Sequence, residues 1–206
     1  MSDECIQVVV RCRPMNSKEK AQSSKNIIFT DIPLHQVAIT NPEALNEEPK
    51  SFTFNRSYDE NTQQRLFYED CCFSLVESVL QGFNATVFAY GQTGCGKSFT
   101  MQGPDNSHNM RGVIPNSFNH IFEAIKGTTD VQYLIRCSYL EIYNEEIRDL
   151  LVHDHKTAPK CEIKEDPNKG IYVKNLTFID VENEDGLARV LQNVRKLSRC
   201  TPICYL

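Results

Sequence analysis

Residues 85–101 constrain this chain more than any other stretch. The segment Ala-Thr-Val-Phe-Ala-Tyr at 85–90 is apolar and predicts a short strand, and it runs directly into Gly-Gln-Thr-Gly-Cys-Gly-Lys-Ser at 91–98. This run has the spacing G-x-x-x-x-G-K-[ST]. Glycines at such positions let the backbone curl so that several N–H groups face the oxygens of a phosphate. The stretch therefore predicts a nucleotide-binding loop between a strand and a helix.

The side chains of this loop suit the same chemistry. Lys97 adds a positive charge for the β- and γ-phosphates, and Ser98 offers a hydroxyl to Mg²⁺. A helix that begins near Lys97 would point its positive end at the same anion. The alternative is a glycine-rich turn that has this spacing by chance; the apolar segment before it and the helix-forming residues after it favour the loop. The predicted phosphate-binding residues are Gly91, Gln92, Thr93, Gly94, Cys95, Gly96, Lys97 and Ser98.

Composition limits the other function classes. The chain has 206 residues, of which 40% are hydrophobic and 24% are charged, which are values typical of one globular domain or a piece of a larger one. The net charge of −5 gives no support to a general nucleic-acid or membrane-surface binder. No apolar run approaches the length of a membrane-spanning helix. We therefore expect neither nucleic acid nor a membrane as a partner.

The nine cysteines do not indicate a zinc site. No C-x-x-C occurs, and the pair Cys200 and Cys204 has no second pair or nearby histidine. Buried thiols in a reducing compartment are the simpler interpretation. The N-terminus also lacks the basic and apolar regions of a signal peptide, so the sequence predicts a cytosolic protein.

The order of the expected elements predicts an α/β fold with a central, mostly buried sheet flanked by helices, because strands alternate with helical patterns. The expected strands are residues 6–12, 26–30, 36–40, 50–54, 85–90, 131–142, 161–165, 171–174 and 177–181, with 161–174 forming a hairpin. The expected helices are residues 62–80, a segment from about 97, residues 115–127, residues 143–151 and a last helix capped by Asn183. The buried face expected for this last helix consists of Leu187, Val190, Leu191 and Val194. The loop 102–112 is either a ligand-sensitive element or a plain insertion.

The blocks around the loop resemble the kinesin motor domain. The sequence Phe-Ala-Tyr-Gly-Gln-Thr-Gly-Cys-Gly-Lys-Ser-Phe-Thr-Met at 88–101 is similar to the phosphate-loop signature of that family, and four further blocks agree in order and spacing. These are residues 10–14 (Val-Arg-Cys-Arg-Pro), 111–115 (Arg-Gly-Val-Ile-Pro), 138–151 (Ser-Tyr-Leu-Glu-Ile-Tyr-Asn-Glu, then Asp-Leu-Leu) and 170–173 (Gly-Ile-Tyr-Val). Within the family, Arg-Cys-Arg-Pro-Met close to the N-terminus is most similar to the intraflagellar-transport kinesins.

The resemblance implies a P-loop NTPase fold, ATP and Mg²⁺ as ligands, and a microtubule as partner, in the cytoplasm on the cytoskeleton and in the cilium. It implies that residues 91–98 bind the triphosphate with Ser98 on Mg²⁺, and that the hairpin meets the acidic surface of tubulin. The residues implied to line the adenine site are Arg11, Arg13, Pro14 and Phe99, and those implied to contact tubulin are Lys164, Lys169 and Lys174. A base held by arginine and aromatic faces would be bound by stacking.

The chain also departs from the family. A kinesin motor continues past the helix that begins near Asn183 with two switch motifs, Asn-x-x-Ser-Ser-Arg-Ser-His and Asp-Leu-Ala-Gly-Ser-Glu, and neither occurs here. We therefore expect residues 1–193 to be the N-terminal part of a motor domain and residues 194–206 a divergent tail, from a truncated isoform or an incomplete gene model. In the family's fold the phosphate-loop strand pairs with strands from the later half, so 85–90 is expected to lack ladder partners.

Three functions are compatible with these residues. The first is an ATP-driven, microtubule-directed motor, by family resemblance. The second is a non-motile fragment that binds nucleotide or tubulin, because phosphoryl transfer needs groups that the family places on the two switches. The third is a chain that misfolds, since unpaired buried backbone groups cost about 1–3 kcal/mol each. On this basis no catalytic residue is assigned, and only the nucleotide-binding half of the catalytic set is expected.

Overall fold

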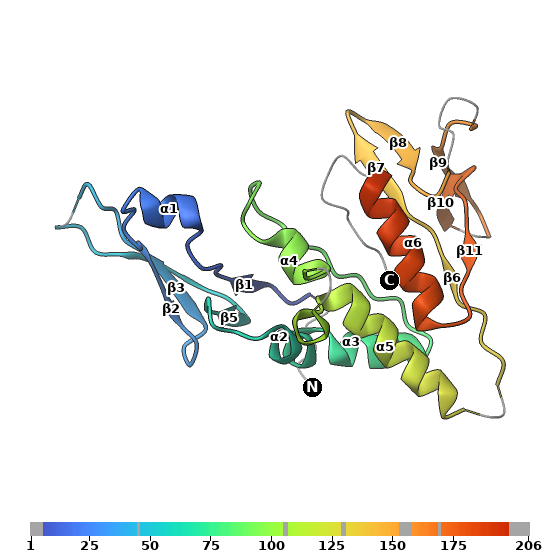
Figure 1. Ribbon diagram of the computed structural model, residues 1–206, viewed down its shortest axis with the longest axis horizontal. Coiled ribbons are helices and arrows are strands. Elements are labelled where there is room, and N and C mark those ends of the chain that lie inside the picture. The colour runs from blue at the N-terminus through green and yellow to red at the C-terminus, as the bar shows by residue number, and fades with distance from the viewer. Residues whose placement is uncertain are drawn as a thin grey trace. The chain divides into compact units, whose positions relative to one another are not determined.

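The computed structural model describes residues 6–44, 46–104, 107–128, 131–152, 158–168 and 170–197 (Figure 1). The chain divides into two compact units, residues 1–67 and residues 68–206, and the division falls within helix α2. Each unit is described by itself. Within the described residues, none of the helices is both long and apolar enough to cross a membrane.

The first unit is built from short strands and one short helix. A parallel pair joins β1 to β5, and an antiparallel sheet has the order β2-β3-β4. Its elements are β1 (Val9–Arg11), α1 (Ser17–Ala21), β2 (Ile28–Asp31), β3 (Gln36–Ile39), β4 (Lys50–Thr53), β5 (Arg56–Tyr58) and the first half of α2 (Gln64–Cys71).

The core of the first unit gathers around two aromatic rings. Tyr58 and Phe67 are buried, and their rings meet edge to face with centroids 4.9 Å apart, a geometry that aromatic pairs prefer. The buried Ser57 hydroxyl donates to the carbonyl oxygen of Asp31 at 2.9 Å and so links β5 to β2. The predicted strands 6–12, 26–30, 36–40 and 50–54 are each confirmed over a shorter or shifted range.

The second unit contains the longer helices and three separate strand pairs. The pairs are β6 with β11, β7 with β8 and β9 with β10, all antiparallel. Its elements are α3 (Phe73–Leu80), α4 (Lys97–Met101), the 3₁₀ turn η1 (His108–Met110), α5 (Val113–Lys126), β6 (Arg136–Cys137), β7 (Leu140–Tyr143), β8 (Glu146–Asp149), β9 (Glu162–Asp166), β10 (Gly170–Lys174), β11 (Ile179–Asp180) and α6 (Glu184–Leu197).

Helix α6 packs with the face that its sequence predicts. Its Leu187 joins a cluster with Phe122 of α5 and Val181, and its Val194 joins Tyr139 and Leu150 beside β7 and β8 (Figure 1). The predicted cap is also confirmed, because the Asn183 carboxamide oxygen accepts the backbone N–H of Gly186 at 2.8 Å. These contacts fix α6 against both α5 and the hairpin of β7 and β8.

The predicted central sheet is not formed by the described residues, which is a correction to the expected architecture. Strands pair there in twos and, in one case, in a three-stranded sheet. Residues 85–90, expected as a strand, join no ladder, and the expectation that they lack ladder partners is confirmed. Their exposure still alternates residue by residue, with Phe88 and Tyr90 outward, which is the pattern of an extended segment without a neighbour. Of the expected strand 131–142, only β6 and the first part of β7 pair.

Three further predictions are wrong in detail. Residues 143–151 do not form a helix but contain the turn and the second strand of the hairpin of β7 and β8. Asn144 and Glu145 both have positive φ (48° and 63°) and make the two-residue turn. The expected helix 62–80 is two helices, α2 and α3, divided at Cys72, whose φ of −118° departs from the usual helical value of about −63°. The predicted helix 115–127 begins two residues early, at Val113, since a proline is tolerated in the first helical turn.

Candidate phosphate-binding loop and adjoining residues

The loop at 91–96 is shaped by glycines with positive φ. Gly91, Gly94 and Gly96 have φ of 144°, 80° and 104°, a region that other residues rarely adopt. At Gly91 an added Cβ would also lie 2.5 Å from the Cys95 sulfur, so the Cys95 side chain would have to move. The backbone N–H of Cys95 donates to the Gln92 carbonyl oxygen at 3.2 Å across the curl. The glycine spacing thus produces the tight curl that the motif predicts.

Lys97 lies over this loop. Its ammonium donates to the carbonyl oxygens of Gly91 at 2.7 Å and Gln92 at 2.9 Å. Lys97 is also the first residue of α4, as predicted, with Gly96 at the cap position. The positive charge is therefore held at the mouth of the loop, beside the end of a helix whose unbonded N–H groups favour an anion.

These residues fit a bound triphosphate. Curled backbone, an ammonium and a helix start together form the donor set that phosphate oxygens require. Ser98 follows on the exposed side of α4 and carries the hydroxyl assigned to Mg²⁺. Mg²⁺ keeps several waters and takes few protein ligands. Ser98 would be one of these few protein ligands, beside the phosphates and waters. In the described part of the chain no group of three or more His, Cys, Asp or Glu is arranged for a metal.

The segment after α4 is closed at its base by two glycines. Gly103 has φ 77°, and a Cβ there would lie 2.2 Å from the Met110 carbonyl oxygen. A Cβ at Gly112 would lie 2.6 Å from the backbone of Met101 and Gln102, and the Gly112 N–H donates to the Gln102 carbonyl oxygen at 3.1 Å. The chain therefore leaves α4 and returns to α5 through one close backbone contact.

Arg11 and Arg13, predicted to line the adenine site, belong to the first unit and have partners inside it. Arg11 donates to the Gln64 side-chain oxygen at 2.6 Å and to the Thr62 carbonyl oxygen at 2.9 Å, and its guanidinium lies 4.9 Å from the centre of the Phe67 ring. These contacts hold Arg11 against the start of α2 and contribute to packing as well as charge.

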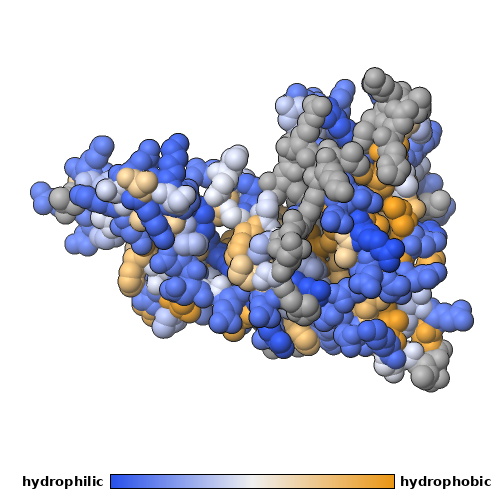
Figure 2. Space-filling view, in the orientation of Figure 1, coloured by the Kyte–Doolittle hydropathy of each residue, from blue (hydrophilic) through white to orange (hydrophobic). Residues whose placement is uncertain are grey.

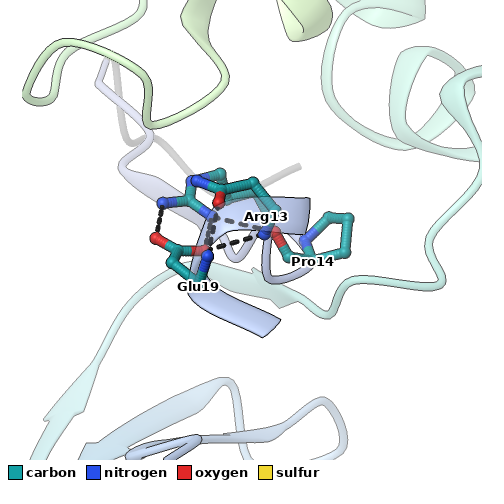
Figure 3. A network of polar contacts seen from close by, with 4 residues as sticks. Arg13, Pro14 and Glu19 are labelled. Atoms are coloured by element: carbon teal, nitrogen blue, oxygen red, sulfur yellow. Dashed lines mark hydrogen bonds and ion pairs between the residues drawn. The ribbon is translucent and has the colours of Figure 1, made fainter. Parts of the chain in front are cut away.

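Arg13 forms a two-point ion pair with Glu19 (Figure 3). Its two terminal nitrogens reach the two carboxylate oxygens at 2.8 and 2.6 Å, and one also donates to the Pro14 carbonyl oxygen at 2.9 Å. The Arg13 hydrogen bond, followed by the backbone N–H of Asn16, lowers the pKa of Glu19 to about 2. Glu19 and Asn16 also cap α1 reciprocally. The pattern Asn-x-x-Glu could have predicted this helix, and sequence reasoning missed it.

The predicted base-binding set is divided between the two units. Arg11, Arg13 and Pro14 lie in the first unit, whereas Phe99, about two-fifths exposed on α4, lies in the second. Their common adenine site therefore stays a prediction.

The predicted hairpin is confirmed as the pair β9 and β10. The lysines predicted to contact tubulin belong to this segment. Lys164 and Lys174 lie on one face of it with Glu162, and Lys164 donates to the Glu162 carboxylate at 2.9 Å. This hydrogen bond raises the pKa of Lys164 and lowers the pKa of Glu162. The opposite face exposes Ile163 and Ile171. Lys169 lies outside the described residues.

A partly buried polar network in the second unit was missed by sequence reasoning. The Tyr68 hydroxyl is 2.8 Å from His120 Nδ1, and His120 Nε2 is 2.7 Å from a Glu77 carboxylate oxygen. The His120 ring stacks on Phe73 with centroids 4.3 Å apart. Desolvation raises the pKa of Tyr68 to about 12, so the hydroxyl stays protonated and can donate to His120. The network joins α2, α3 and α5. Its residues lie too far apart in the sequence for a local pattern to predict their contacts.

Comparisons with known proteins agree with the resemblance. The family model of the kinesin motor domain matches residues 11–202. Kinesin-like protein KIF3C from Bos taurus is 47% identical over 191 residues, which are 92% of this chain and 24% of that protein. The same protein from Pongo abelii and from Mus musculus is similar to the same extent.

The chain thus spans about a quarter of the length of these curated relatives. The match to residue 202 takes in part of the segment 194–206 that the sequence sets apart, and the boundary at 193 stays a prediction. Because the family model covers nearly the whole chain, and that coverage includes the phosphate-binding loop described above, the chain belongs to the kinesin motor-domain family.

Proposed function

We propose that residues 91–98 bind Mg·ATP, and that the chain is the nucleotide-binding part of an ATP-driven, microtubule-directed motor. The observation that carries this proposal is the position of Lys97, whose ammonium lies over the loop on the Gly91 and Gln92 carbonyl oxygens at the start of α4. Membership of the kinesin motor-domain family supports the choice of nucleotide and track.

Each part of the loop has a task in nucleotide binding. The curled backbone presents N–H groups to the phosphates, and Lys97 neutralises charge on the β- and γ-phosphates. Ser98 donates its hydroxyl oxygen to the metal, which when bound supplies charge that stabilises the transferring phosphoryl group. We propose that Phe99, Arg11, Arg13 and Pro14 hold the base by stacking, with both arginines anchored by the partners described above.

Lys97→Ala is expected to abolish the stabilisation of the chain by Mg·ATP. A ligand that binds only the folded state at about 100 times its dissociation constant stabilises that state by about 2.7 kcal/mol. Removing the ammonium removes the charge that this binding needs. The measurement is thermal unfolding with and without Mg·ATP, together with the anisotropy of a fluorescent ATP analogue.

The matched control is Lys126→Ala, which removes an exposed lysine at the end of α5 that pairs with Glu123. This variant is expected to keep the full response to Mg·ATP. If Lys97→Ala binds the analogue as tightly as the unsubstituted chain, the loop is not the nucleotide site and the proposal fails.

We further propose that the β9–β10 hairpin contacts tubulin through Lys164 and Lys174. Both lysines lie on one face of the hairpin, where Glu162 neutralises part of their charge. The double substitution to glutamate is expected to weaken cosedimentation with microtubules at least tenfold, because the contact would then oppose an acidic surface. Lys18→Glu together with Lys126→Glu, two exposed lysines outside the hairpin, makes the same change in net charge and is the control. An equal loss with that double variant would assign the effect to overall charge instead of the hairpin.

A motor with these contacts would act on the cytoskeleton. We propose the cytoplasm as its location and include the cilium, on the similarity of the N-terminal block to intraflagellar-transport kinesins.

A further inference from the structure

The three-stranded sheet of the first unit has an apolar groove on one face. The register of β2, β3 and β4 places Ile28, Ile39 and Phe52 on the same face, since they occupy alternate positions on paired strands. All three are partly exposed, Phe52 to 49%, whereas Val37 beside them is buried. A depression of about 360 Å³ opens next to Ile39 and Phe52. The face of the molecule drawn in Figure 2 is mostly hydrophilic, with hydrophobic residues in small patches.

The size of the depression limits what it can hold. Sites for small ligands span about 300–1,000 Å³, so this one is at the lower end. Ile27, Pro42 and Phe52 contribute apolar surface to it, and no curled backbone or helix start lies among its lining residues. It therefore suits one or two apolar side chains of a peptide better than a nucleotide.

The negative charge at the rim of the depression indicates that a molecule bound there carries positive charge. Glu47 and Glu48 line the depression, and Glu43 lies on the same loop, against the single positive charge of Lys50. The ion pairs found in the described part of the chain include none of these four residues. The rim thus has uncompensated negative charge, which attracts a positive partner and repels an acidic surface such as that of tubulin.

We propose that this groove is a docking site for a short segment of a partner protein that carries basic and apolar side chains together. Its apolar side chains enter beside Ile39 and Phe52, and its lysine or arginine groups meet Glu47 and Glu48. The lining of the groove shares no residue with the phosphate-binding loop, which belongs to the second unit. Binding through the groove would therefore tether a partner without using the nucleotide or tubulin contacts proposed above.

The test uses a synthetic peptide that alternates leucine with lysine, labelled for fluorescence anisotropy and titrated with the full chain. Two comparison peptides replace lysine by glutamate or leucine by serine. The basic apolar peptide is expected to bind at least tenfold more tightly than either comparison peptide, and its affinity should fall as salt is added. Equal binding of the glutamate peptide would overturn the proposed charge preference, and equal binding of the serine peptide would overturn the apolar contribution.

Substitutions locate the site. Phe52→Ser and the pair Glu47→Lys with Glu48→Lys are each expected to reduce the affinity at least tenfold. Phe29→Ser is the matched control, because Phe29 is 66% exposed on the opposite face of the same sheet and should leave binding unchanged. Unchanged binding in Phe52→Ser would overturn the proposal. So would self-association of the unsubstituted chain in sedimentation that Phe52→Ser abolishes, since the groove would then be covered by a second copy.

Discussion

Replacing Gly103 with alanine is expected to lower the free energy of unfolding of the chain by about 3–5 kcal/mol, as two separate penalties combine. Gly103 has φ 77°, where a side chain strains the backbone. The new Cβ would also lie 2.2 Å from the Met110 carbonyl oxygen, which is backbone and cannot rotate away. The base of the loop after α4 would have to open. The measurement is denaturant unfolding followed by circular dichroism.

Substitutions at two other glycines measure the backbone strain and the steric clash separately. Gly170 has a similar φ of 72° but nothing within 4 Å of an added Cβ, so Gly170→Ala measures the backbone strain alone, about 1 kcal/mol. Gly112 has an ordinary φ of −78°, and its added Cβ would lie 2.6 Å from backbone atoms, so Gly112→Ala measures the steric clash alone. If Gly103→Ala costs no more than Gly170→Ala, the close contact at the loop base does not exist in solution.

Ile114→Ala is expected to cost about 3–4 kcal/mol of stability, within the range of about 2–5 kcal/mol for isoleucine to alanine in a packed core. Ile114 is 1% exposed near the start of α5, beside the fully buried Val113. The substitution removes three carbon atoms, and the surrounding helices can refill the space only in part. Denaturant unfolding again measures the change.

The size of the deleted group provides the internal check. Ile114→Val should cost about 0.5–1.5 kcal/mol. Ile171→Ala makes the same chemical change at a side chain that is 75% exposed on β10 and should stay within about 0.5 kcal/mol. Equal losses for Ile114→Ala and Ile171→Ala would show that α5 is not packed in the isolated chain.

Local signals in the sequence were sufficient for several elements. The period of Leu187, Val190, Leu191 and Val194 predicted the buried face of α6, and Asn183 predicted its start, because both depend on residues within a few turns of one helix. The phosphate-binding loop was equally local: its glycine spacing dictates its curl. The hairpin of β9 and β10 followed from a turn-forming run between two short apolar segments.

The failures involve residues whose conformation depends on distant neighbours or on unusual dihedral angles. Asn144 and Glu145 turn the chain with positive φ, yet a glutamate at such a position gives no turn signal, so the segment had the pattern of a helix. Residues 85–90 were expected as a strand from their apolar composition, which is wrong, and were also expected to lack ladder partners, which is confirmed. A strand exists only where another backbone pairs with it. The partners of Arg11 and Arg13 could not be found by pattern, since Gln64 is 53 residues away from Arg11.

The contact of Lys97 with the carbonyl oxygens of Gly91 and Gln92 has a consequence for the energetics of nucleotide binding. A loop already drawn into shape around its own ammonium has lost most of its conformational entropy on folding, so an arriving phosphate has little ordering left to impose. The phosphate must instead compete with two carbonyl oxygens for the same cation. The affinity of the loop for a phosphate therefore depends on how readily phosphate oxygens replace the Gly91 and Gln92 carbonyl oxygens around the Lys97 ammonium nitrogen.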